Sequence, residues 1–330
     1  MKILITGGAG FIGSHLADRL VARGDEVLVL DNLSTGTERN LVTARRSGRL
    51  HVHRGCAKDS RLVARLAHGT DLIVHLAAAV GVRLIVEHPV SSIETNLNAT
   101  SSVLHAAFDA QVPVLLASSS EVYGKSSACP FKEDQDLHLG PTQRSRWSYA
   151  CSKAMDEWLA FAWYQERGLP VLITRLFNTV GPRQIGRYGM VLPNLVQQAA
   201  SGRPMTIHGN GQQTRSFCHV RDTVDAMIRL TEADAAWGTV VNVGSDQEIS
   251  IRALAERIRE RTGSGSSLTF VPYEQAYGTG FEDMDRRVPD LTRLQSLTGF
   301  QPRTTLDTII DEVFAECARP ASQRELYGEH

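Results

Sequence analysis

Short runs of apolar and β-branched residues recur through the first half of the chain, and each has the length of a buried strand. Helical periodicity fills the stretches between them, as where Ile12, Leu16 and Leu20 recur at four-residue spacing and form one apolar stripe. Strands that alternate with such helices predict a doubly wound α/β fold around a parallel sheet. The expected strands are residues 2–6, 26–30, 71–76, 114–117 and 171–176.

The alternation loosens after about residue 178, where Gly and Pro become more frequent. We therefore expect residues 1–177 to form the main domain and residues 178–330 to form a smaller C-terminal lobe. An apolar run at 239–243 predicts a late strand, and segments such as 239–244 are expected to return to the main sheet. The Gly-Ser run at 263–267 predicts a turn, and an apolar stripe that follows Leu306 predicts a final amphipathic helix.

Composition excludes several classes of protein. The 330 residues are 42% hydrophobic, which allows a sizeable core, and 35 Lys and Arg nearly balance 36 Asp and Glu, so no overall field favours nucleic acid or an anionic membrane. No apolar run approaches the roughly 18 residues of a membrane span, and the chain starts on a strand without the features of a signal sequence. The five cysteines are scattered and form no C-x-x-C pair, which argues against disulfides and a metal site. We expect a cytoplasmic protein with reduced thiols.

A glycine-rich loop, Thr6-Gly7-Gly8-Ala9-Gly10-Phe11-Ile12-Gly13, connects the first expected strand to the first helix. Glycines there permit a tight turn and a close approach of the backbone to a pyrophosphate, which the helix N-terminus attracts. Asp31 stands 18 residues after Gly13, at the end of the second strand, where a carboxylate accepts hydrogen bonds from a ribose and repels a 2′-phosphate. This placement predicts a dinucleotide site that prefers NAD to NADP. The alternative for Asp31 is an ordinary turn or cap residue.

A second constellation begins where the strand at 114–117 runs into a series of serines. Tyr149 and Lys153 follow at a spacing of four residues, so on a helix they share one face and the ammonium lies beside the phenol. We expect Lys153 and a positive nicotinamide to lower the Tyr149 pKa from its usual value of about 10 and make the phenol a general base. Ser119 is expected to hydrogen-bond the same substrate oxygen. The alternative for an isolated Tyr/Lys pair is a solvated helix face.

The motifs together resemble those of the extended short-chain dehydrogenases/reductases, in the group of nucleotide-sugar epimerases, dehydratases and decarboxylases. Besides the glycine loop and the Tyr149/Lys153 pair, the matching segments are residues 75–78 (HLAA), 118–124 (SSSEVYG), 175–183 (RLFNTVGPR) and 209–217 (GNGQQTRSF). The resemblance covers nearly the whole chain. It implies that the C-terminal lobe binds the sugar nucleotide and that two long helices build a homodimer.

The resemblance also implies which residues hold the ligands. The expected NAD contacts are Gly7, Gly10, Phe11, Ile12, Gly13, Asp31, Asn32, Leu76, Ala77, Ala78, Tyr149 and Lys153. One position departs from the pattern, because Cys56 follows Gly55 where these proteins often carry an acidic residue near the adenine. Asp59 could take that part only if its loop were displaced.

Two phosphates require fixed cations with forked donors, which arginine supplies. Arg215 follows a Gly-Asn-Gly turn and Arg287 precedes Val-Pro-Asp, and the resemblance associates both arginines with the nucleotide diphosphate. Asn178, at the end of a buried strand, is expected to orient the sugar or a phosphate. The alternative for Asn178 is an asparagine that caps a turn.

Ser120 and Glu121 bear on the choice of reaction. In this group a base removes the proton of the sugar C4 hydroxyl, and the resulting 4-ketone is the branch point between reactions. A 4,6-dehydratase then needs an Asp-Glu pair, but the Asp position here is Ser120, and a hydroxyl is a poor general acid near neutrality. A 4-epimerase needs no carboxylate at the position of Glu121. Ser120 therefore counts against dehydration, and a 4-epimerase leaves the presence of Glu121 unexplained.

The run Ser119-Ser120-Glu121 with Val-Tyr-Gly most resembles the Thr-Ser-Glu-Val-Tyr-Gly of UDP-glucuronate decarboxylases, and Arg287-Val-Pro-Asp resembles their Arg-Lys-Pro-Asp. The leading hypothesis is therefore a UDP-glucuronate decarboxylase that forms UDP-xylose or releases the 4-keto pentose. Ser119 and Tyr149 would stabilise an enolate, and Ser120 and Glu121 would position the ring and manage the proton that enters at C5. Glu121 could instead be a structural carboxylate. A UDP-hexose or UDP-hexuronate 4-epimerase is the alternative function, ahead of a 4,6-dehydratase or a non-catalytic NAD-binding protein.

Overall fold

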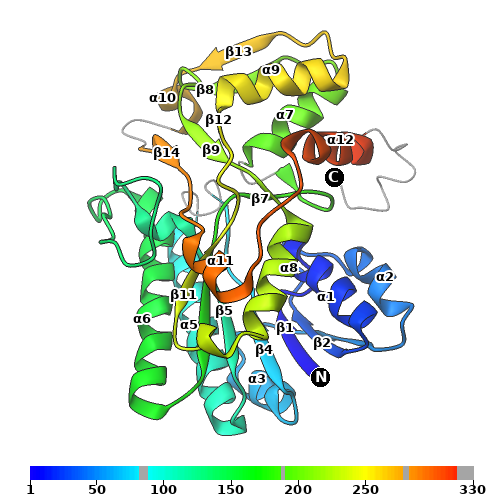
Figure 1. The fold of residues 1–330 in the computed structure, drawn as a ribbon, viewed down its shortest axis with the longest axis vertical. Helices are drawn as coiled ribbons and strands as arrows, with labels where there is room; N and C mark the ends of the chain where they lie inside the picture. Colours follow the sequence, from blue (N-terminus) through cyan, green and yellow to red (C-terminus); the bar gives the residue numbers. More distant parts are fainter. Residues whose placement is uncertain (82–87, 187–189, 278–281, 318–330) are drawn as a thin grey trace.

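The computed structural model describes residues 1–81, 88–186, 190–277 and 282–317 (Figure 1). Its main element is a seven-stranded sheet in the order β11-β6-β5-β4-β1-β2-β3, in which every neighbouring pair is parallel. The strands are β1 (Lys2–Thr6), β2 (Glu26–Asp31), β3 (Leu50–Arg54), β4 (Leu72–His75), β5 (Val114–Ser119), β6 (Val171–Leu176) and β11 (Val240–Val243). The strand order reverses direction between β1 and β4, so the predicted doubly wound fold is confirmed.

All five strands expected in the first half are present, and the late run at 239–243 forms β11, which pairs with β6 at the edge of the sheet. β3 was not predicted. It is the opposite edge strand, and the polar side chains of His51, His53 and Arg54 interrupt the apolar pattern there. An edge strand buries little of its surface, so it lacks the continuous apolar run that reveals the central strands.

Helices cover both faces of the sheet (Figure 1). One face packs against α3 (Ser60–Ala67), α5 (Pro89–Ala110) and α6 (Ser148–Arg167). The other face packs against α1 (Phe11–Arg23), α2 (Val42–Arg45), α8 (Val220–Thr231) and α11 (Thr292–Thr298). Strand residues alternate between the two cores, with Ile3 and Ile5 in one and Leu4 in the other. Two of these helices, α8 and α11, come from the second half of the chain, which therefore returns to the sheet in more than one place.

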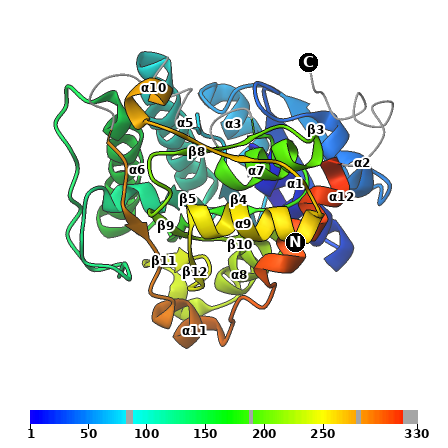
Figure 2. The same cartoon turned by 90° about the horizontal axis from the view of Figure 1, so that it is seen from above.

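A smaller lobe with its own apolar core stands over the carboxyl ends of the strands (Figures 1 and 2). Its core elements are α7 (Val191–Ala200), β8 (Met205–His208), α9 (Ile251–Thr262), β13 (Leu268–Val271) and α12 (Leu306–Cys317). The predicted final helix is α12, which buries Ile309, Ile310 and Val313. The predicted turn after residue 262 is also confirmed, because Gly263 ends α9 in the left-handed conformation at φ 62°.

Short elements connect the two parts of the molecule. The strands among them are β7 (Thr179–Val180), β9 (Thr214–Ser216), β10 (Cys218–His219), β12 (Glu248–Ser250) and β14 (Arg286–Arg287). The short helices are η1 (Glu38–Leu41), η2 (Ser120–Tyr123), η3 (Ser145–Trp147), η5 (Asp234–Ala236) and α10 (Tyr273–Tyr277). All five cysteines carry free thiols. Within the ranges that the structure describes, none of the helices has the length and apolarity needed to cross a membrane.

Candidate active site

A cavity of about 560 Å³ opens at the carboxyl ends of the strands, between the loops that follow β1 and β4. Ligands of doubly wound sheets bind at this point, because the connections after neighbouring strands leave in opposite directions and open a crevice. The predicted cofactor residues that line this cavity are Gly7, Gly10, Phe11, Ile12, Gly13, Asp31, Asn32, Leu76, Ala77, Ala78 and Tyr149. We refer to it below as the cofactor cavity.

The glycine loop fits a pyrophosphate because side chains have no room in it. Gly7 has a φ of 72°, and a Cβ there would lie 2.8 Å from the backbone nitrogen of Ala77, in the loop that follows β4. A Cβ at Gly13 would lie 2.4 Å from the carbonyl oxygen of Gly7. Helix α1 begins directly after Gly10, and no side chain caps its N-terminus. The loop thus presents backbone and the positive end of a helix to the cavity, as a dinucleotide requires.

Asp31 ends β2 at the wall of the cofactor cavity. Its Oδ2 accepts a hydrogen bond from the amide of Ala9 at 2.9 Å, and its Oδ1 accepts one from the amide of Leu33 at 2.7 Å. Burial raises the pKa of this carboxyl group, while the two amides lower it. Each carboxylate oxygen has a second lone pair, so the fixed carboxylate can still accept from ribose hydroxyls.

The adenine end of the cavity has an unusual composition. Cys56 lines it, together with Gly55 and Asn40. Asp59, the possible substitute for the missing acidic residue, is the N-cap of α3, where its carboxylate accepts from the amide of Leu62 at 3.0 Å. Because Asp59 is engaged in that cap, the structure places Cys56 and not Asp59 at the wall of the cavity.

Tyr149 lies on the first turn of α6 and is buried against the end of β5. Burial raises the pKa of its phenol, whereas the charge of Lys153 and a hydrogen bond with Ser119 lower it, and the charge of Glu121 raises it. The charge of Lys153 therefore lowers the Tyr149 pKa, as expected. In the protein alone burial outweighs the lysine and the Tyr149 pKa is raised. The lowering expected from Lys153 together with a bound nicotinamide stays a prediction.

Lys153 has an acidic partner on the same helix that was not predicted from the sequence. Its ammonium donates to Oδ2 of Asp156 at 2.9 Å, and both side chains are buried. Lys153 lies one helical turn after Tyr149, but it is not among the described residues that line the cofactor cavity. Its predicted direct contact with NAD therefore remains a prediction.

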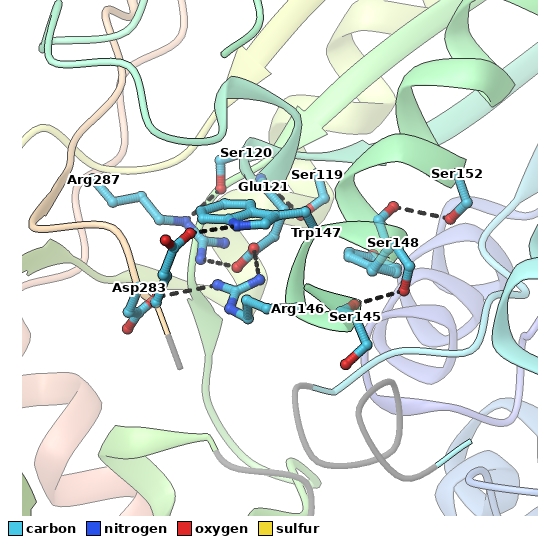
Figure 3. Close-up of polar contacts among 12 residues, drawn as sticks. Ser119, Ser120, Glu121, Ser145, Arg146, Trp147, Ser148, Ser152, Asp283 and Arg287 are labelled. Atoms are coloured by element: carbon cyan, nitrogen blue, oxygen red, sulfur yellow. Dashed lines mark hydrogen bonds and ion pairs between the residues drawn. The ribbon is translucent and has the colours of Figure 1, made fainter. Parts of the chain in front are cut away.

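Glu121 sits between two arginines at the carboxyl end of β5 (Figure 3). Its Oε2 accepts from Nη1 of Arg146 at 2.6 Å, and its Oε1 accepts from Nη1 of Arg287. Burial opposes ionisation of this carboxyl group, but the two guanidinium groups outweigh burial and lower the Glu121 pKa to about 2. Ser120 is held in the same cluster, since its Oγ accepts from Nε of Arg287 at 2.8 Å and donates to the carbonyl of Leu176 at 3.1 Å.

A second cavity, of about 270 Å³, extends toward the smaller lobe. Its wall includes Arg215, His208, Gln213 and Tyr273 from that lobe. The residues shared by both cavities include Ser119, Tyr149, Asn178 and Arg287. The two cavities thus meet at the predicted catalytic residues, which is the arrangement needed to bring a substrate against a cofactor.

The predicted substrate residues are only partly where the sequence suggested. Arg215 lines the second cavity, and its Nη2 donates to Asp283 at 2.9 Å. Asn178 lines both cavities, and its side-chain amide donates to the carbonyl of Ser216 at 3.0 Å, as a capping residue would. Arg287 pairs with Glu121 and lies close enough to Tyr149 for its charge to lower the pKa of the phenol, and its expected contact with a diphosphate stays a prediction.

Sequence reasoning missed the residues that complete this charge cluster. Arg146 is buried, with 5% of its side chain exposed, and it bridges Glu121 and Asp283. The alternating chain of charges runs Arg287, Glu121, Arg146, Asp283 (Figure 3). It continues from Asp283 to Arg215. The one available signal for Arg146 was its position three residues before Tyr149, on the approach to α6. Three cations against two carboxylates leave the cluster with a net positive charge, which suits an anionic ligand.

The described residues contain no group of three or more His, Cys, Asp or Glu side chains arranged to hold a metal ion. The glycine cradle, the helix N-terminus and the carboxylate at the end of β2 instead fit a dinucleotide.

Comparison with known proteins agrees with this geometry. A family model described as GDP-mannose 4,6 dehydratase matches residues 4–313. The chain is 39% identical over 312 residues to the UDP-N-acetyl-alpha-D-glucosaminuronate decarboxylase of Bacillus cytotoxicus, with coverage of 94% of this chain and 96% of that protein. It is 35% identical over 308 residues to UDP-glucuronic acid decarboxylase 1 of Xenopus tropicalis, with coverage of 93% and 69%.

A solved structure shares the fold over almost the same length. DesIV, a dTDP-glucose 4,6-dehydratase from Streptomyces venezuelae with NAD and TYD bound, superposes with a TM-score of 0.85 at 30% sequence identity and covers 98% of this chain and 97% of that chain. The chain therefore belongs to the GDP-mannose 4,6-dehydratase family of extended short-chain dehydrogenases/reductases, together with nucleotide-sugar enzymes of the decarboxylase and dehydratase type.

Proposed function

We propose that this protein is an NAD-dependent UDP-glucuronate decarboxylase, which oxidises the sugar at C4, removes the C6 carboxylate as CO2 and forms UDP-xylose, or releases the 4-keto pentose. The observation that carries the proposal is the buried carboxylate of Glu121 between Arg146 and Arg287, next to Ser119 and Tyr149. Guanidinium groups at this place offer forked donors to the carboxylate of a uronic acid. Three arginines face two carboxylates in this cluster, and a neutral hexose would bring no negative charge to balance the remaining positive charge.

In the first step the Tyr149 phenolate takes the proton of the C4 hydroxyl, and the Ser119 hydroxyl donates a hydrogen bond to the same oxygen. NAD+, when bound, accepts the C4 hydride and later returns it. Lys153 lies four residues after Tyr149 on α6, and its positive charge stabilises the phenolate against the effect of burial. Tyr149 therefore combines the position and the electrostatic support that a general base needs.

In the second step the C6 carboxylate is β to the new C4 ketone. The bond between C5 and C6 breaks, CO2 leaves, and the bonding electrons move onto the C4 oxygen to form an enolate. The hydrogen bonds of Tyr149 and Ser119 at that oxygen stabilise the charge as it develops. A proton then enters at C5, and reduction at C4 completes the pentose.

The role proposed for Glu121 changes with the structure. A carboxyl group with a pKa of about 2 is ionised at neutral pH, so Glu121 has no proton to deliver to C5. Ser120 is similarly engaged, because its hydroxyl is bonded to Arg287 and to the carbonyl of Leu176. We therefore assign Glu121 and Ser120 to holding Arg287 in place against the sugar ring, and we no longer assign to them the transfer of the C5 proton.

A second substrate deserves a direct test. The relative from Bacillus cytotoxicus, at 39% identity, is named for UDP-N-acetyl-alpha-D-glucosaminuronate. That sugar carries the same C6 carboxylate and the same C4 hydroxyl, so the steps above apply to it without change. The two uronates differ at C2, away from the atoms that react.

The experiment is incubation of the purified protein with NAD+ and, separately, UDP-glucuronate, UDP-N-acetylglucosaminuronate and UDP-glucose, followed by mass spectrometry of the nucleotide sugars. Loss of CO2 from either uronate supports the decarboxylase and identifies its substrate. Conversion between UDP-glucose and UDP-galactose, or a uronate product of unchanged mass, would establish the 4-epimerase instead. Loss of water from UDP-glucose would indicate a 4,6-dehydratase.

We also propose that two copies of the chain associate through α5 and α6. These helices pack against each other on the outside of the sheet (Figure 1). Each leaves large apolar side chains exposed to solvent. Val90 is 69% exposed on α5, and Trp158 and Met155 are 58% and 46% exposed on α6. An apolar surface of this kind on a protein of this size favours an interface, as the family resemblance implies.

A further inference from the structure

Asp156 on α6 is a buried carboxylate that the reaction described above does not use. It has no exposed surface, and its Oδ2 accepts from the ammonium of Lys153 at 2.9 Å. Its Oδ1 is also buried and has no hydrogen-bond partner among the residues that the structure describes. A buried carboxylate with an unsatisfied oxygen destabilises a fold, and two aliphatic side chains in place of the Lys153–Asp156 pair would pack here at lower cost. The retention of a charge at this position calls for a functional reason.

The other charged groups near Lys153 do not replace Asp156. Glu157 follows on the same helix, but Arg175 of β6 binds it through Nη2 at 2.7 Å and Nε at 3.0 Å, and the hydroxyl of Ser118 donates to it as well. His75 of β4 faces Lys153 from the sheet, and burial lowers its pKa to about 3, so its ring is neutral at working pH. Tyr149 lies on the preceding turn of α6, and its phenolate is the group that the positive charge of Lys153 stabilises.

A buried ammonium without an anionic partner tends to lose its proton. Buried lysines of this kind have pKa values as low as about 5 to 6, because burial disfavours the charged form. For Lys153 burial acts in that direction, but the pKa of the ammonium is raised, because the adjacent Asp156 carboxylate, with smaller effects of Tyr149 and Glu157, more than compensates. A neutral lysine would give the Tyr149 phenolate no positive charge beside it.

We propose that Asp156 is a positioning residue that keeps Lys153 protonated and fixed in place, so that Tyr149 retains an adjacent cation at the pH where the enzyme works. The proposal rests on the proposed function only in taking Tyr149 as the base. The ion pair itself lies inside the protein and does not depend on which sugar nucleotide binds. It can therefore be tested without a substrate.

The first test is thermal unfolding of the purified protein, measured by circular dichroism between about pH 6 and pH 10, a range below the usual pKa of a free lysine. In Asp156→Asn, burial without a counterion should bring the folded-state pKa of Lys153 below its unfolded-state value. Between those two values the unfolded chain binds more protons than the folded one, so the unfolding midpoint of the variant should rise with pH. The wild-type midpoint should show no such rise. A variant profile parallel to that of the wild type would overturn the proposal.

Glu26→Gln provides the matched control, because it removes a carboxylate from another Lys pair, the exposed contact with Lys2 at 3.5 Å. We expect its pH profile to match that of the wild type. The double variant Lys153→Met, Asp156→Asn removes both charges, and the rise with pH seen in Asp156→Asn should disappear. If Asp156→Asn does not fold at neutral pH, the double variant should still fold. Failure of the neutral pair to fold would show that Asp156 acts in packing and would overturn the proposal.

The second test measures C4 oxidation directly, as the initial rate of NADH formation on addition of the uronate that proves to be the substrate. Above the lowered pKa of Lys153 in Asp156→Asn, the protonated fraction of Lys153 falls about tenfold per pH unit. The alkaline limb of the variant's pH–rate profile should therefore move to lower pH. Asp156→Glu keeps the charge and should restore the wild-type limb. If none of the uronates is oxidised, the proposed function fails and the unfolding experiment still decides the role of Asp156. An unshifted limb in Asp156→Asn would contradict that role.

Discussion

Replacement of Glu121 by Gln tests the centre of the charge cluster. Gln keeps the shape of the side chain but removes the negative charge. Its amide NH2 group can only donate a hydrogen bond, so it cannot accept one from the guanidinium group that it faces. Either Arg146 or Arg287 then loses its buried partner. Because both arginines are nearly inaccessible, water cannot replace the lost carboxylate, and the variant should be markedly less stable than the wild type.

Two lines of reasoning give the magnitude. The Glu121 pKa falls from 4.5 to about 2 on folding, which corresponds to about 3 kcal/mol of stability at neutral pH. Removal of one partner of a buried ion pair typically costs about 3 to 5 kcal/mol. Because folding lowers the Glu121 pKa, the ionised carboxylate stabilises the folded protein. This stabilisation is fully present above the unfolded-state pKa and is lost as the pH falls through the folded-state pKa. The difference between the two proteins should therefore shrink between about pH 4.5 and pH 2.

The assay is scanning calorimetry or circular dichroism at neutral pH, where we expect the midpoint of Glu121→Gln to be lower by roughly 5 °C for a protein of this size. Glu248→Gln is the control, because Glu248 forms the same kind of pair with Arg286, which is 49% exposed. That variant should lose less than about 1 kcal/mol. With the uronate substrate, Glu121→Gln should still form NADH but release CO2 slowly. Equal midpoints for wild type and Glu121→Gln, or unimpaired CO2 release, would refute the reasoning.

The remaining predictions concern the base, the cofactor and the interface. Tyr149→Phe should retain its fold and NAD binding but lose about two to four orders of magnitude in turnover, because it lacks the general base; near-normal steady-state rates would mean that another group takes the proton. Asp31→Asn should narrow the preference for NAD over NADP, since the carboxylate no longer opposes a 2′-phosphate; an unchanged ratio of the two dissociation constants in calorimetry would contradict its role. Trp158→Arg should elute as a monomer in size-exclusion chromatography with light scattering, because a charge would be buried in the proposed interface; a persistent dimer would place the interface elsewhere.

Features set by local spacing were predictable from the amino-acid sequence. The central strands are apolar on both faces because helices cover both sides of the sheet, so their bounds were predicted closely. The glycine loop is recognisable because a tight turn at φ 72° excludes most side chains whatever surrounds it. Tyr149 and Lys153 share one helix face by their spacing alone. Edge strand β3 was not predicted, because polar residues interrupt its sequence, whereas the strands inside the sheet are continuous apolar runs.

The charge cluster was not predictable, because its members come from separate elements. Glu121 lies in η2, Arg146 in η3 and Arg287 in β14, and nothing in their spacing indicates that they meet. A charged side chain is exposed by default, so the sequence offers no reason to expect Arg146 in the interior. Arg287 was assigned to a diphosphate from the family resemblance, which gave no sign of its contact with Glu121.

The sequence by itself thus determined the class of fold, the glycine loop between the first strand and the first helix, and the spacing of Tyr149 and Lys153 on one helix face, because each depends on residues close together in the chain. The tertiary structure alone decided the electrostatics. The pKa of Tyr149 rises despite Lys153, and the pKa of Glu121 falls despite burial. Both outcomes depend on how deeply a group is buried and on which distant charges reach it, and in a medium of low dielectric these two effects oppose each other with similar strength.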